Sequence, residues 1–346
     1  MRIMVTGGLG FIGSQMVRWL LDNEPDVDII NVDALTYAGN PANVANYADN
    51  SRYQWIHASI ADRAQMEPCF ADKPIDAVIN FAAESHVDRS IQSGVPFVAT
   101  NVLGTQILLE LARTYHVPRF LHVSTDEVYG SLGPNGLFRE TSPLQPNSPY
   151  AASKAAADLM VLAAARTYQQ DVVITRCSNN YGPYQFPEKL IPLFVTNGIE
   201  GQPWPLYGDG RNVRDWLHVE DHVRAIWAVL NSGKSGQIYN IGGHTEKSNW
   251  EIAEDLRAIL GLPASVIVPV PDRLGHDRRY AMDAQKITKE LGWEPRIAWE
   301  DGIASTVAWY QQHEDWWRPL KTGAYREYYR QQYGESGTTR APSASR

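Results

Sequence analysis

A glycine-rich turn between a short apolar run and a helical pattern is the feature that most constrains the fold. Residues 2–6 are followed at once by Gly7, Gly10 and Gly13, where a helical pattern begins. Glycines at this spacing allow a tight turn and a close approach of the backbone to a pyrophosphate at the helix amino terminus. Asp33 ends the next apolar run, 20 residues after Gly13, where a carboxylate can bind both ribose hydroxyls and repel a 2′-phosphate. The pattern predicts an NAD site; the alternative is an ordinary glycine turn with a solvated Asp33.

Alternating apolar runs and helical patterns predict the fold class. The expected buried strands cover residues 3–5, 29–32, 77–81, 120–123 and 172–175, and helical patterns between them include 14–21 and 103–115. Strands and helices that alternate in this way form a parallel sheet with helices on both faces. We therefore expect an α/β, doubly wound Rossmann core over residues 1–176.

The texture of the sequence changes after Arg176, where prolines interrupt the pattern. We expect a smaller C-terminal lobe over residues 177–334 that mainly binds substrate, with a strand near 238–241 returning to the core. Helices are expected at 249–260, with Asn249 as the cap, and at 284–291 and 299–313. Residues 335–346 have no apolar period, which predicts a flexible tail.

Composition excludes several classes of function. A net charge of -8 without basic patches argues against nucleic acid and membrane surfaces as partners. Cys69 and Cys177 lack metal-ligand spacing, so we expect two reduced, buried thiols and no metal. We also see no signal peptide and no apolar run near the roughly 18 residues of a membrane span, which predicts a soluble cytoplasmic protein.

Five side chains form the candidate catalytic group. Thr125, Asp126 and Glu127 follow an expected strand, at the sheet edge where α/β enzymes gather their chemistry. Tyr150 and Lys154 are spaced i and i+4, which places them on one face of the next helix. A lysine ammonium favours the phenolate of a neighbouring tyrosine, which can then act as a base. The alternative for the adjacent acids is a solvated acidic turn.

With these motifs the chain resembles the dTDP-glucose 4,6-dehydratases, within the extended short-chain dehydrogenase/reductase superfamily. The resemblance runs from Met1 to about Gly334 and is most specific at residues 82–90, 124–130, 176–192, 207–222 and 275–281. Related 4-epimerases and decarboxylases share the glycines and the Tyr/Lys pair but lack the adjacent Asp-Glu. The resemblance implies conversion of dTDP-glucose to dTDP-4-dehydro-6-deoxyglucose and water. The alternatives are a UDP-glucose 4,6-dehydratase, another NAD-dependent nucleotide-sugar epimerase or decarboxylase, and a redox-sensing NAD-binding module without catalysis.

The resemblance also implies a role for each catalytic side chain. Tyr150 takes the proton of the sugar 4-hydroxyl, and Thr125 forms a hydrogen bond with the same hydroxyl. Lys154 binds the nicotinamide ribose. Glu127 removes the proton on C5, and Asp126 protonates the departing 6-hydroxyl. Two carboxyl groups with opposite protonation states meet this need.

The remaining implied contacts divide between cofactor and substrate. Those to NAD are Gly7, Gly10, Phe11, Ile12, Gly13, Asp33, Leu35, Thr36, Ser59, Ile60, Ala82, Ser85, Thr100, Tyr150, Lys154 and Asn180. Those to the nucleotide sugar are Ser85, Thr125, Asn179, Lys189, Leu190, Pro205, Tyr207, Arg214, Asn249, Asp272 and His276. Ser59 departs from the family, which commonly has an Asp there to hold the adenine amino group, and this bears on NAD affinity.

The superfamily resemblance further implies a homodimer in which the helix of Tyr150 joins a four-helix bundle. The expected contact faces are Ala-rich around Ala151, Ala155 and Ala156 and Leu-rich around Leu108 and Leu111. The alternative is that these faces are buried within one subunit.

Overall fold

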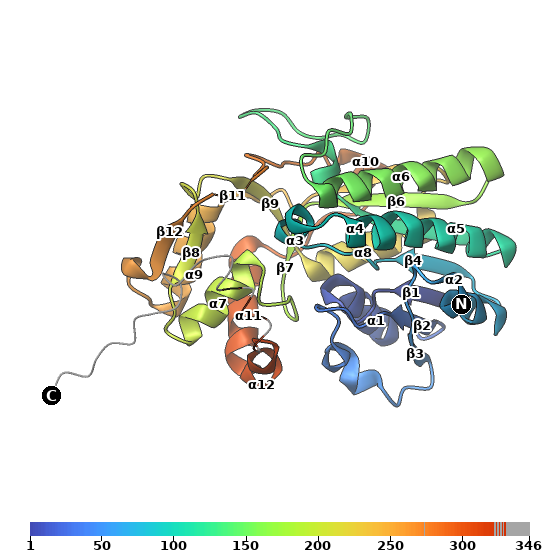
Figure 1. Cartoon of the computed structure of the whole chain (residues 1–346), viewed down its shortest axis with the longest axis horizontal. Helices are drawn as coiled ribbons and strands as arrows, with labels where there is room; N and C mark the ends of the chain where they lie inside the picture. Colours follow the sequence, from blue (N-terminus) through green and yellow to red (C-terminus); the bar gives the residue numbers. More distant parts are fainter. Residues whose placement is uncertain (273, 322, 324, 326, 328, 330–346) are drawn as a thin grey trace.

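The computed structural model describes residues 1–272, 274–321, 323, 325, 327 and 329, so the tail predicted at 335–346 lies outside the described residues. Figure 1 shows a sheet flanked by helices on the right and a smaller lobe on the left. The large part contains the amino terminus, and the smaller lobe is built mainly from residues after β6.

The central sheet has seven strands among the described residues, in the order β10-β6-β5-β4-β1-β2-β3, and every pairing is parallel. The chain order reverses between β1 and β4, which creates the crevice where ligands bind in open α/β sheets. The strands are β1 (Arg2–Thr6), β2 (Asp28–Asp33), β3 (Tyr53–His57), β4 (Ala77–Asn80), β5 (Arg119–Thr125), β6 (Val172–Cys177) and β10 (Ile238–Ile241).

Helices cover both faces of this sheet, and each face has its own apolar core. One face packs against α1 (Phe11–Asn23), α8 (Val219–Ser232) and α10 (Gln285–Leu291). The other packs against α2 (Arg63–Ala71), α5 (Thr105–Thr114) and α6 (Pro149–Tyr168). Since α8, β10 and α10 come from beyond residue 176, the core is not confined to residues 1–176 as its predicted boundary suggests.

The smaller lobe surrounds a third apolar cluster that is rich in aromatic side chains. Trp204 stacks on Phe194 with ring centroids 5.0 Å apart and is completely buried. The strands of the lobe are β7 (Asn179–Tyr181), β8 (Trp204–Tyr207), β9 (Val213–His218), β11 (Glu246–Ser248) and β12 (Ile267–Val270). Its helices are α7 (Leu190–Ile199), α9 (Asn249–Leu260), α11 (Trp299–Gln312) and α12 (Glu314–Trp317).

Short elements complete the chain. The α-helical ones are α3 (Val87–Gln92) and α4 (Val95–Phe97), followed by the π-helical turn η2 (Val98–Gly104). The 3-10 turns are η1 (Pro41–Tyr47), η3 (Asp126–Tyr129), η4 (Ala264–Val266) and η5 (Arg318–Leu320).

One contact joins the smaller lobe directly to the glycine turn. The indole N–H of Trp316, in α12, donates to Asn43 Oδ1 at 2.9 Å, and Asn43 Nδ2 donates to the carbonyl of Leu9 at 2.8 Å. Arg18 of α1 lies 4.1 Å from the ring centroid of Tyr184, which belongs to the lobe. The position of the lobe is therefore tied to the backbone of the predicted cofactor turn.

Three local expectations are changed by the structure. The cap of α9 is Ser248, whose hydroxyl accepts from the N–H of Glu251 in a capping box, while Asn249 is the first helical residue. The strand β3 was not expected, because its exposed edge position leaves no continuous apolar run. The stretch Val95–Thr114 has the length and hydropathy of a membrane span, but half of its most apolar window is buried and α5 packs against α6.

We predict that Trp204→Ala destabilises the protein far more than Trp55→Ala. Removing a fully buried indole leaves a cavity and costs about 3–5 kcal/mol, whereas Trp55 is 38% exposed on the edge strand β3. Calorimetry should show a melting temperature several degrees lower for the first variant. Equal melting temperatures for both variants would contradict the packing described for the smaller lobe.

Candidate active site

The glycine turn between β1 and α1 has the geometry of a phosphate cradle. Gly7 has a φ of +72°, and a Cβ there would lie 2.7 Å from the backbone nitrogen of Ala82. A Cβ on Gly13 would lie 2.2 Å from the carbonyl oxygen of Gly7. Both positions therefore require glycine, and the turn leaves the amino terminus of α1 facing the cavity, which favours an anion.

Asp33 closes the ribose side of the same cavity. Its Oδ2 accepts from the N–H of Leu9 at 2.9 Å and its Oδ1 from the N–H of Leu35 at 2.8 Å. Burial raises the pKa of Asp33, and these two backbone hydrogen bonds lower it. The carboxylate is thus held in one orientation at the end of β2, as a ribose-binding acid must be.

A continuous cavity runs from the glycine turn to the ends of β4, β5 and β6. Of the predicted NAD contacts, Leu35 does not line this cavity and instead supplies the N–H that holds Asp33. The predicted residues that do line it are Gly7, Gly10, Phe11, Ile12, Gly13, Asp33, Thr36, Ser59, Ile60, Ala82, Ser85, Thr100, Tyr150, Lys154 and Asn180.

Tyr150 and Lys154 enter this cavity from the first turns of α6. Ser148 caps the helix by accepting from the N–H of Ala151, and Pro149 begins it. The ammonium of Lys154 donates to the carbonyl of Val123 at 2.7 Å, and burial lowers the pKa of Lys154 to about 8. Burial, followed by the charge of Glu127, raises the pKa of Tyr150 well above its usual value.

The adjacent acids lie on η3, directly after β5. The hydroxyl of Thr125 donates to Asp126 Oδ1 at 3.2 Å and accepts from the N–H of Glu127 at 3.3 Å. Asp126 is 2% exposed, and burial together with the charge of Glu127 raises its pKa well above the usual value, while Arg214 opposes that shift. Asp126 therefore holds its proton more strongly than an ordinary carboxyl group.

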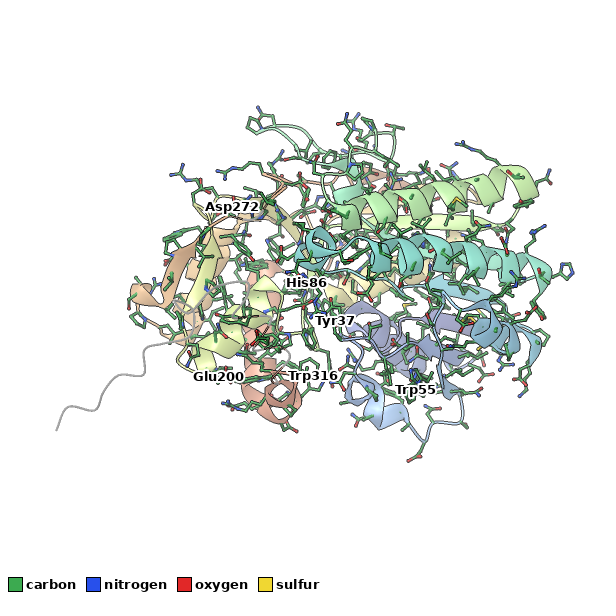
Figure 2. The ribbon with its side chains drawn as sticks, in the orientation of Figure 1. Tyr37, Trp55, His86, Glu200, Asp272 and Trp316 are labelled. Carbon is green, nitrogen blue, oxygen red and sulfur yellow. The ribbon has the colours of Figure 1, made fainter. Side chains whose placement is uncertain are left out.

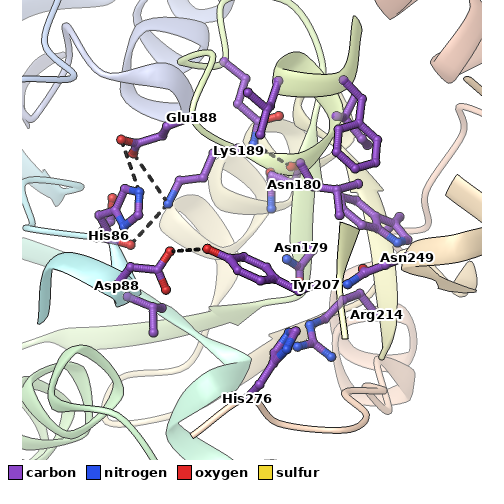
Figure 3. Close-up of a pocket in the computed structure, with 18 of the residues that line it drawn as sticks. His86, Asp88, Asn179, Asn180, Glu188, Lys189, Tyr207, Arg214, Asn249 and His276 are labelled. Carbon is purple, nitrogen blue, oxygen red and sulfur yellow. Dashed lines mark hydrogen bonds and ion pairs between the residues drawn. The ribbon is translucent and has the colours of Figure 1, made fainter. Parts of the chain in front are cut away.

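A second hollow adjoins the first and extends into the smaller lobe (Figure 3). Tyr207 donates to Asp88 Oδ2 at 3.4 Å, and Lys189 donates to the carbonyl of Ser85 at 3.4 Å. The guanidinium of Arg214 stacks 4.3 Å from the ring centroid of Tyr280. The predicted substrate contacts that line this hollow are Ser85, Asn179, Lys189, Leu190, Pro205, Tyr207, Arg214, Asn249 and His276, while Thr125 lines the first cavity.

Asp272 is the predicted substrate contact that the structure does not place in either cavity wall. Its Oδ1 is 2.5 Å from Nδ1 of His276, and about half of its side chain is exposed. Figure 2 places it on the side of the smaller lobe away from Tyr37. The geometry therefore makes Asp272 a residue that orients His276.

Several side chains of these walls were not predicted from the sequence, among them Tyr37, His86, Glu188 and Tyr280. Tyr37 donates to Glu188 Oε1 at 2.9 Å, and His86 Nε2 lies 3.3 Å from Glu188 Oε2, so these three connect the core to the smaller lobe. Figure 2 labels Tyr37 and His86, and Figure 3 shows His86 beside Glu188. Tyr280 faces the acids and feels the charge of Glu127. His86 and Glu188 stand inside the family-like segments 82–90 and 176–192, which is the signal that could have found them.

Comparisons with known proteins agree on one family. The profile of the GDP-mannose 4,6 dehydratase family matches residues 4–306. A dTDP-glucose 4,6-dehydratase of Streptomyces niveus is 52% identical over 93% of this chain and 96% of its own, and one of Escherichia coli K12 is 48% identical over 96% and 99%. The crystal structure of a Streptomyces venezuelae dTDP-glucose 4,6-dehydratase with NAD and TYD bound is 53% identical, covers 93% of this chain and 100% of its own, and superposes with a TM-score of 0.90.

The chain belongs to the dTDP-glucose 4,6-dehydratase family. The Rossmann fold predicted from the sequence is confirmed by this likeness. Ser59, the departure from the family pattern, lines the cofactor cavity, where its hydroxyl accepts from the N–H of Ala61 at 3.3 Å. In this member of the dTDP-glucose 4,6-dehydratase family the serine hydroxyl is thus already engaged by its own backbone turn.

We predict that protein stripped of cofactor binds NAD more tightly than NADP, because Asp33 repels a 2′-phosphate. Asp33→Ser should weaken the binding of NAD by about tenfold, since a charged hydrogen-bond acceptor is lost. The difference between the affinities for NAD and NADP should also become smaller. Titration calorimetry measures both, with Asp28→Ser on the exposed start of the same strand as the control. Tighter binding of NADP by the wild-type protein would contradict the assignment.

Proposed function

We propose that this protein converts dTDP-glucose to dTDP-4-dehydro-6-deoxyglucose and water, and so supplies a precursor for deoxysugar synthesis. The observation that carries the proposal is the pair Asp126 and Glu127, which shares one cavity with Tyr150 and Lys154. An enzyme that only epimerises C4 needs no acid and base for C5 and C6. The adjacent acids supply both.

The glycine turn and Asp33 fit NAD. The close contacts at Gly7 and Gly13 leave room for a pyrophosphate beside the backbone, and Asp33 presents a fixed carboxylate to a ribose. Bound there, NAD would supply a hydride acceptor for C4 and, once reduced, the hydride donor for C6, and its positive charge would favour the phenolate form of Tyr150.

Tyr150, Thr125 and Lys154 act at the 4-hydroxyl. Tyr150 takes its proton, and Thr125, which hydrogen-bonds to Tyr150 and thereby lowers its pKa, holds the same oxygen in place. The charge of Lys154 favours this ionisation, and with a pKa of about 8 the ammonium persists at neutral pH and is lost above that value. The first step should accordingly slow as the pH rises past 8.

Glu127 and Asp126 act at C5 and C6. The 4-ketone acidifies the proton on C5, and Glu127 removes it. Because burial and the charge of Glu127 raise the pKa of Asp126, this group holds its proton more strongly than an ordinary carboxyl group and can deliver it to the 6-hydroxyl as water leaves. The proposal thus gives the two neighbouring carboxyl groups opposite roles, one as acid and one as base.

The smaller lobe supplies positive charge for the diphosphate. Arg214 is 5% exposed and Lys189 lies in the same wall, so a protein with a net charge of -8 presents cations where an anionic substrate enters. The half-buried Asn179, the buried Asn249 and the ring of Tyr207 can pack and hydrogen-bond around the nucleotide.

Mass spectrometry of the products from dTDP-glucose and UDP-glucose, each supplied alone, tests the function. The proposal expects loss of one water from dTDP-glucose and much slower turnover of UDP-glucose. Faster turnover of the uracil nucleotide would make the protein a UDP-glucose 4,6-dehydratase. A product of unchanged mass, or release of carbon dioxide from a uronic-acid substrate, would indicate an epimerase or a decarboxylase and reject dehydration.

We infer that the protein works as a soluble cytoplasmic homodimer, with a contact face that differs from the one expected from the sequence. Leu108 and Leu111 are buried in the core where α5 packs against α6, and Ala151 and Ala155 are also buried within one subunit, so these four are not available to a partner. The outer faces of η2 and α6 instead expose Val98, Leu103 and Leu159, which are each at least half exposed. Apolar side chains at these positions favour a helical contact with a second copy.

Replacing the two bases should separate the half-reactions. In Glu127→Gln, oxidation at C4 should proceed and reduced cofactor should accumulate, while turnover falls by about 10²-fold or more because a positioned general base is lost. In Tyr150→Phe, reduced cofactor should not form at an appreciable rate. Stopped-flow absorbance with dTDP-glucose measures both, with Tyr168→Phe at the exposed end of α6 as the control. Normal formation of reduced cofactor by Tyr150→Phe would contradict the assignment of Tyr150 as the base at the 4-hydroxyl.

Sedimentation equilibrium at micromolar concentration should give twice the mass of the chain. Leu159→Arg should shift the protein to a monomer, because a charge would be buried at the centre of the contact. Leu137→Arg, which changes a similarly exposed leucine in the loop after β5, should remain a dimer. A wild-type monomer would reject the inference.

A further inference from the structure

Behind Lys154 lies a group of buried, ionisable side chains that none of the proposed steps uses. Asp158 belongs to α6, His122 to β5 and Arg176 to β6, and each is at most 2% exposed. Charges so far from water are costly unless they are paired. Because they lie directly behind Lys154, their charges can act on its ammonium.

Asp158 stands at the centre of this group. It follows Lys154 by one helical turn, which places both side chains on the same face of α6. Arg176 Nε donates to Asp158 Oδ2 at 2.8 Å. The other oxygen, Oδ1, lies 3.7 Å from His122 Nε2, and Ser124 of β5 also hydrogen-bonds to this side chain. The carboxylate therefore contacts one cation and one imidazole, and its charge also acts on Lys154.

His122 links this carboxylate to the centre of the sheet. Its Nε2 lies 3.4 Å from Lys154 Nζ, and its Nδ1 lies 3.1 Å from Asn80 Nδ2 on β4. Asn80 is itself fixed by the hydroxyl of Thr6 at 2.7 Å, on β1, so the chain of contacts crosses three strands. Burial, then the charges of Lys154 and Arg176, lower the pKa of His122 well below its usual value, so the ring is neutral.

Lys154 thus lies in a pocket where one anion balances two cations. Burial lowers the pKa of Lys154, and Asp158 is the largest influence that raises it. The titratable groups around Lys154 come from its own helix, from the strands below and from η3. They are Tyr150, Asp158, His122, Arg176, Cys177, Asp126 and Glu127.

The charged side chains of the other elements packed against α6 have contacts with residues other than Lys154. Asp88 and Arg89 of α3 contact Tyr207 and Tyr37. In α5, Glu110 pairs with Arg63 and Arg113 lies over Tyr168. The segments η2 and α4 contain no charged residue. Asp158 is therefore the anion on which the charge of Lys154 chiefly depends at the inner end of the site.

We propose that Asp158, oriented by Arg176 and His122, is a positioning residue that keeps the ammonium of Lys154 charged and fixed against β5. The amine can then serve Tyr150 without being neutralised by its own burial. This role deepens the proposed function, on which its catalytic consequence rests. The effect on the charge of Lys154 itself depends on neither substrate nor cofactor.

Trace labelling with acetic anhydride tests the charge directly, because only the neutral amine reacts. Cofactor-free wild type and Asp158→Asn are labelled over a pH series, and peptide mass spectrometry follows Lys154, with the exposed Lys289 as the internal reference. The midpoint for Lys154 should move at least about one pH unit toward acid in the variant. Equal midpoints, or no labelling of Lys154 in either protein, would overturn the proposal.

A double variant separates electrostatics from misfolding. Asp158→Asn leaves Arg176 buried and unpaired, whereas Asp158→Asn with Arg176→Gln removes both charges, which proteins tolerate better. The midpoint of the double variant should lie between those of wild type and the single variant. If the single variant does not fold, the midpoint of the double variant should still lie on the acid side of the wild-type midpoint. Asp171→Asn, which breaks the Asp–Arg pair with Arg119 at the other end of β5, should leave Lys154 unchanged. A double variant that is shifted further than the single one would contradict the proposal.

The same proteins then link the charge to chemistry. With dTDP-glucose and Asp158→Asn, the rate at which reduced cofactor forms should fall at the pH where labelling shows that Lys154 loses its proton. Asp158→Glu should restore the pH dependence of the wild-type rate. A rate reduced equally at every pH would mean that Asp158 is only structural. Absence of reduced cofactor in wild type would instead reject the proposed function and leave the labelling result standing.

Discussion

Withdrawal from water at the carboxyl edge of the sheet is the constraint on which the rest of this site depends. Tyr150, Lys154 and Asp126 are all buried there, and burial favours the neutral form of each group. It raises the pKa of Tyr150 and Asp126 and lowers the pKa of Lys154. For Asp126 that direction is useful, since an acid must hold its proton. For Lys154 and Tyr150 it opposes the ionisation that the proposed chemistry needs. The charge of Asp158 opposes the effect of burial on Lys154, whereas for Tyr150 the charge of Glu127 adds to burial and only the hydrogen bond with Thr125 opposes it.

The two parts of the molecule contribute to this balance in different ways. The core positions the reacting groups on β5, η3 and α6 and provides the glycine turn. The smaller lobe brings Arg214, which opposes the raised pKa of Asp126, and closes the second hollow beside it. Because Trp316 holds Asn43, which in turn holds Leu9, the lobe and the cofactor turn are fixed relative to each other. The site is thus formed by tertiary contacts between distant segments.

Features of the fold and the site that depend on neighbouring residues could be predicted from the sequence, and features that depend on contacts between distant residues could not. Local signals sufficed for the glycine turn, Asp33, the central strands and the helix that carries Tyr150 and Lys154, since turn chemistry and apolar periodicity are local. The edge strand β3 lacks such a signal because its side chains face water. The contacts of Tyr37, His86 and Glu188 arise from segments that meet only in the fold. The contacts of Leu35 with Asp33 and of Asp272 with His276 are close in sequence, but they depend on loop conformations that apolar periodicity does not encode. The inward direction of Leu108 and Leu111 likewise depends on how α5 packs against α6.

The central claim is that one site oxidises C4 and reduces C6 of the same sugar, with an elimination of water between them. Supplying dTDP-glucose deuterated at C4, mixed with an equal amount of unlabelled substrate carrying a heavy glucose carbon skeleton, tests it most directly. Mass spectrometry and NMR of the products should find deuterium in the C6 methyl group, and only in molecules with the light skeleton. Deuterium that remains at C4, or appears on the heavy skeleton, would contradict the account.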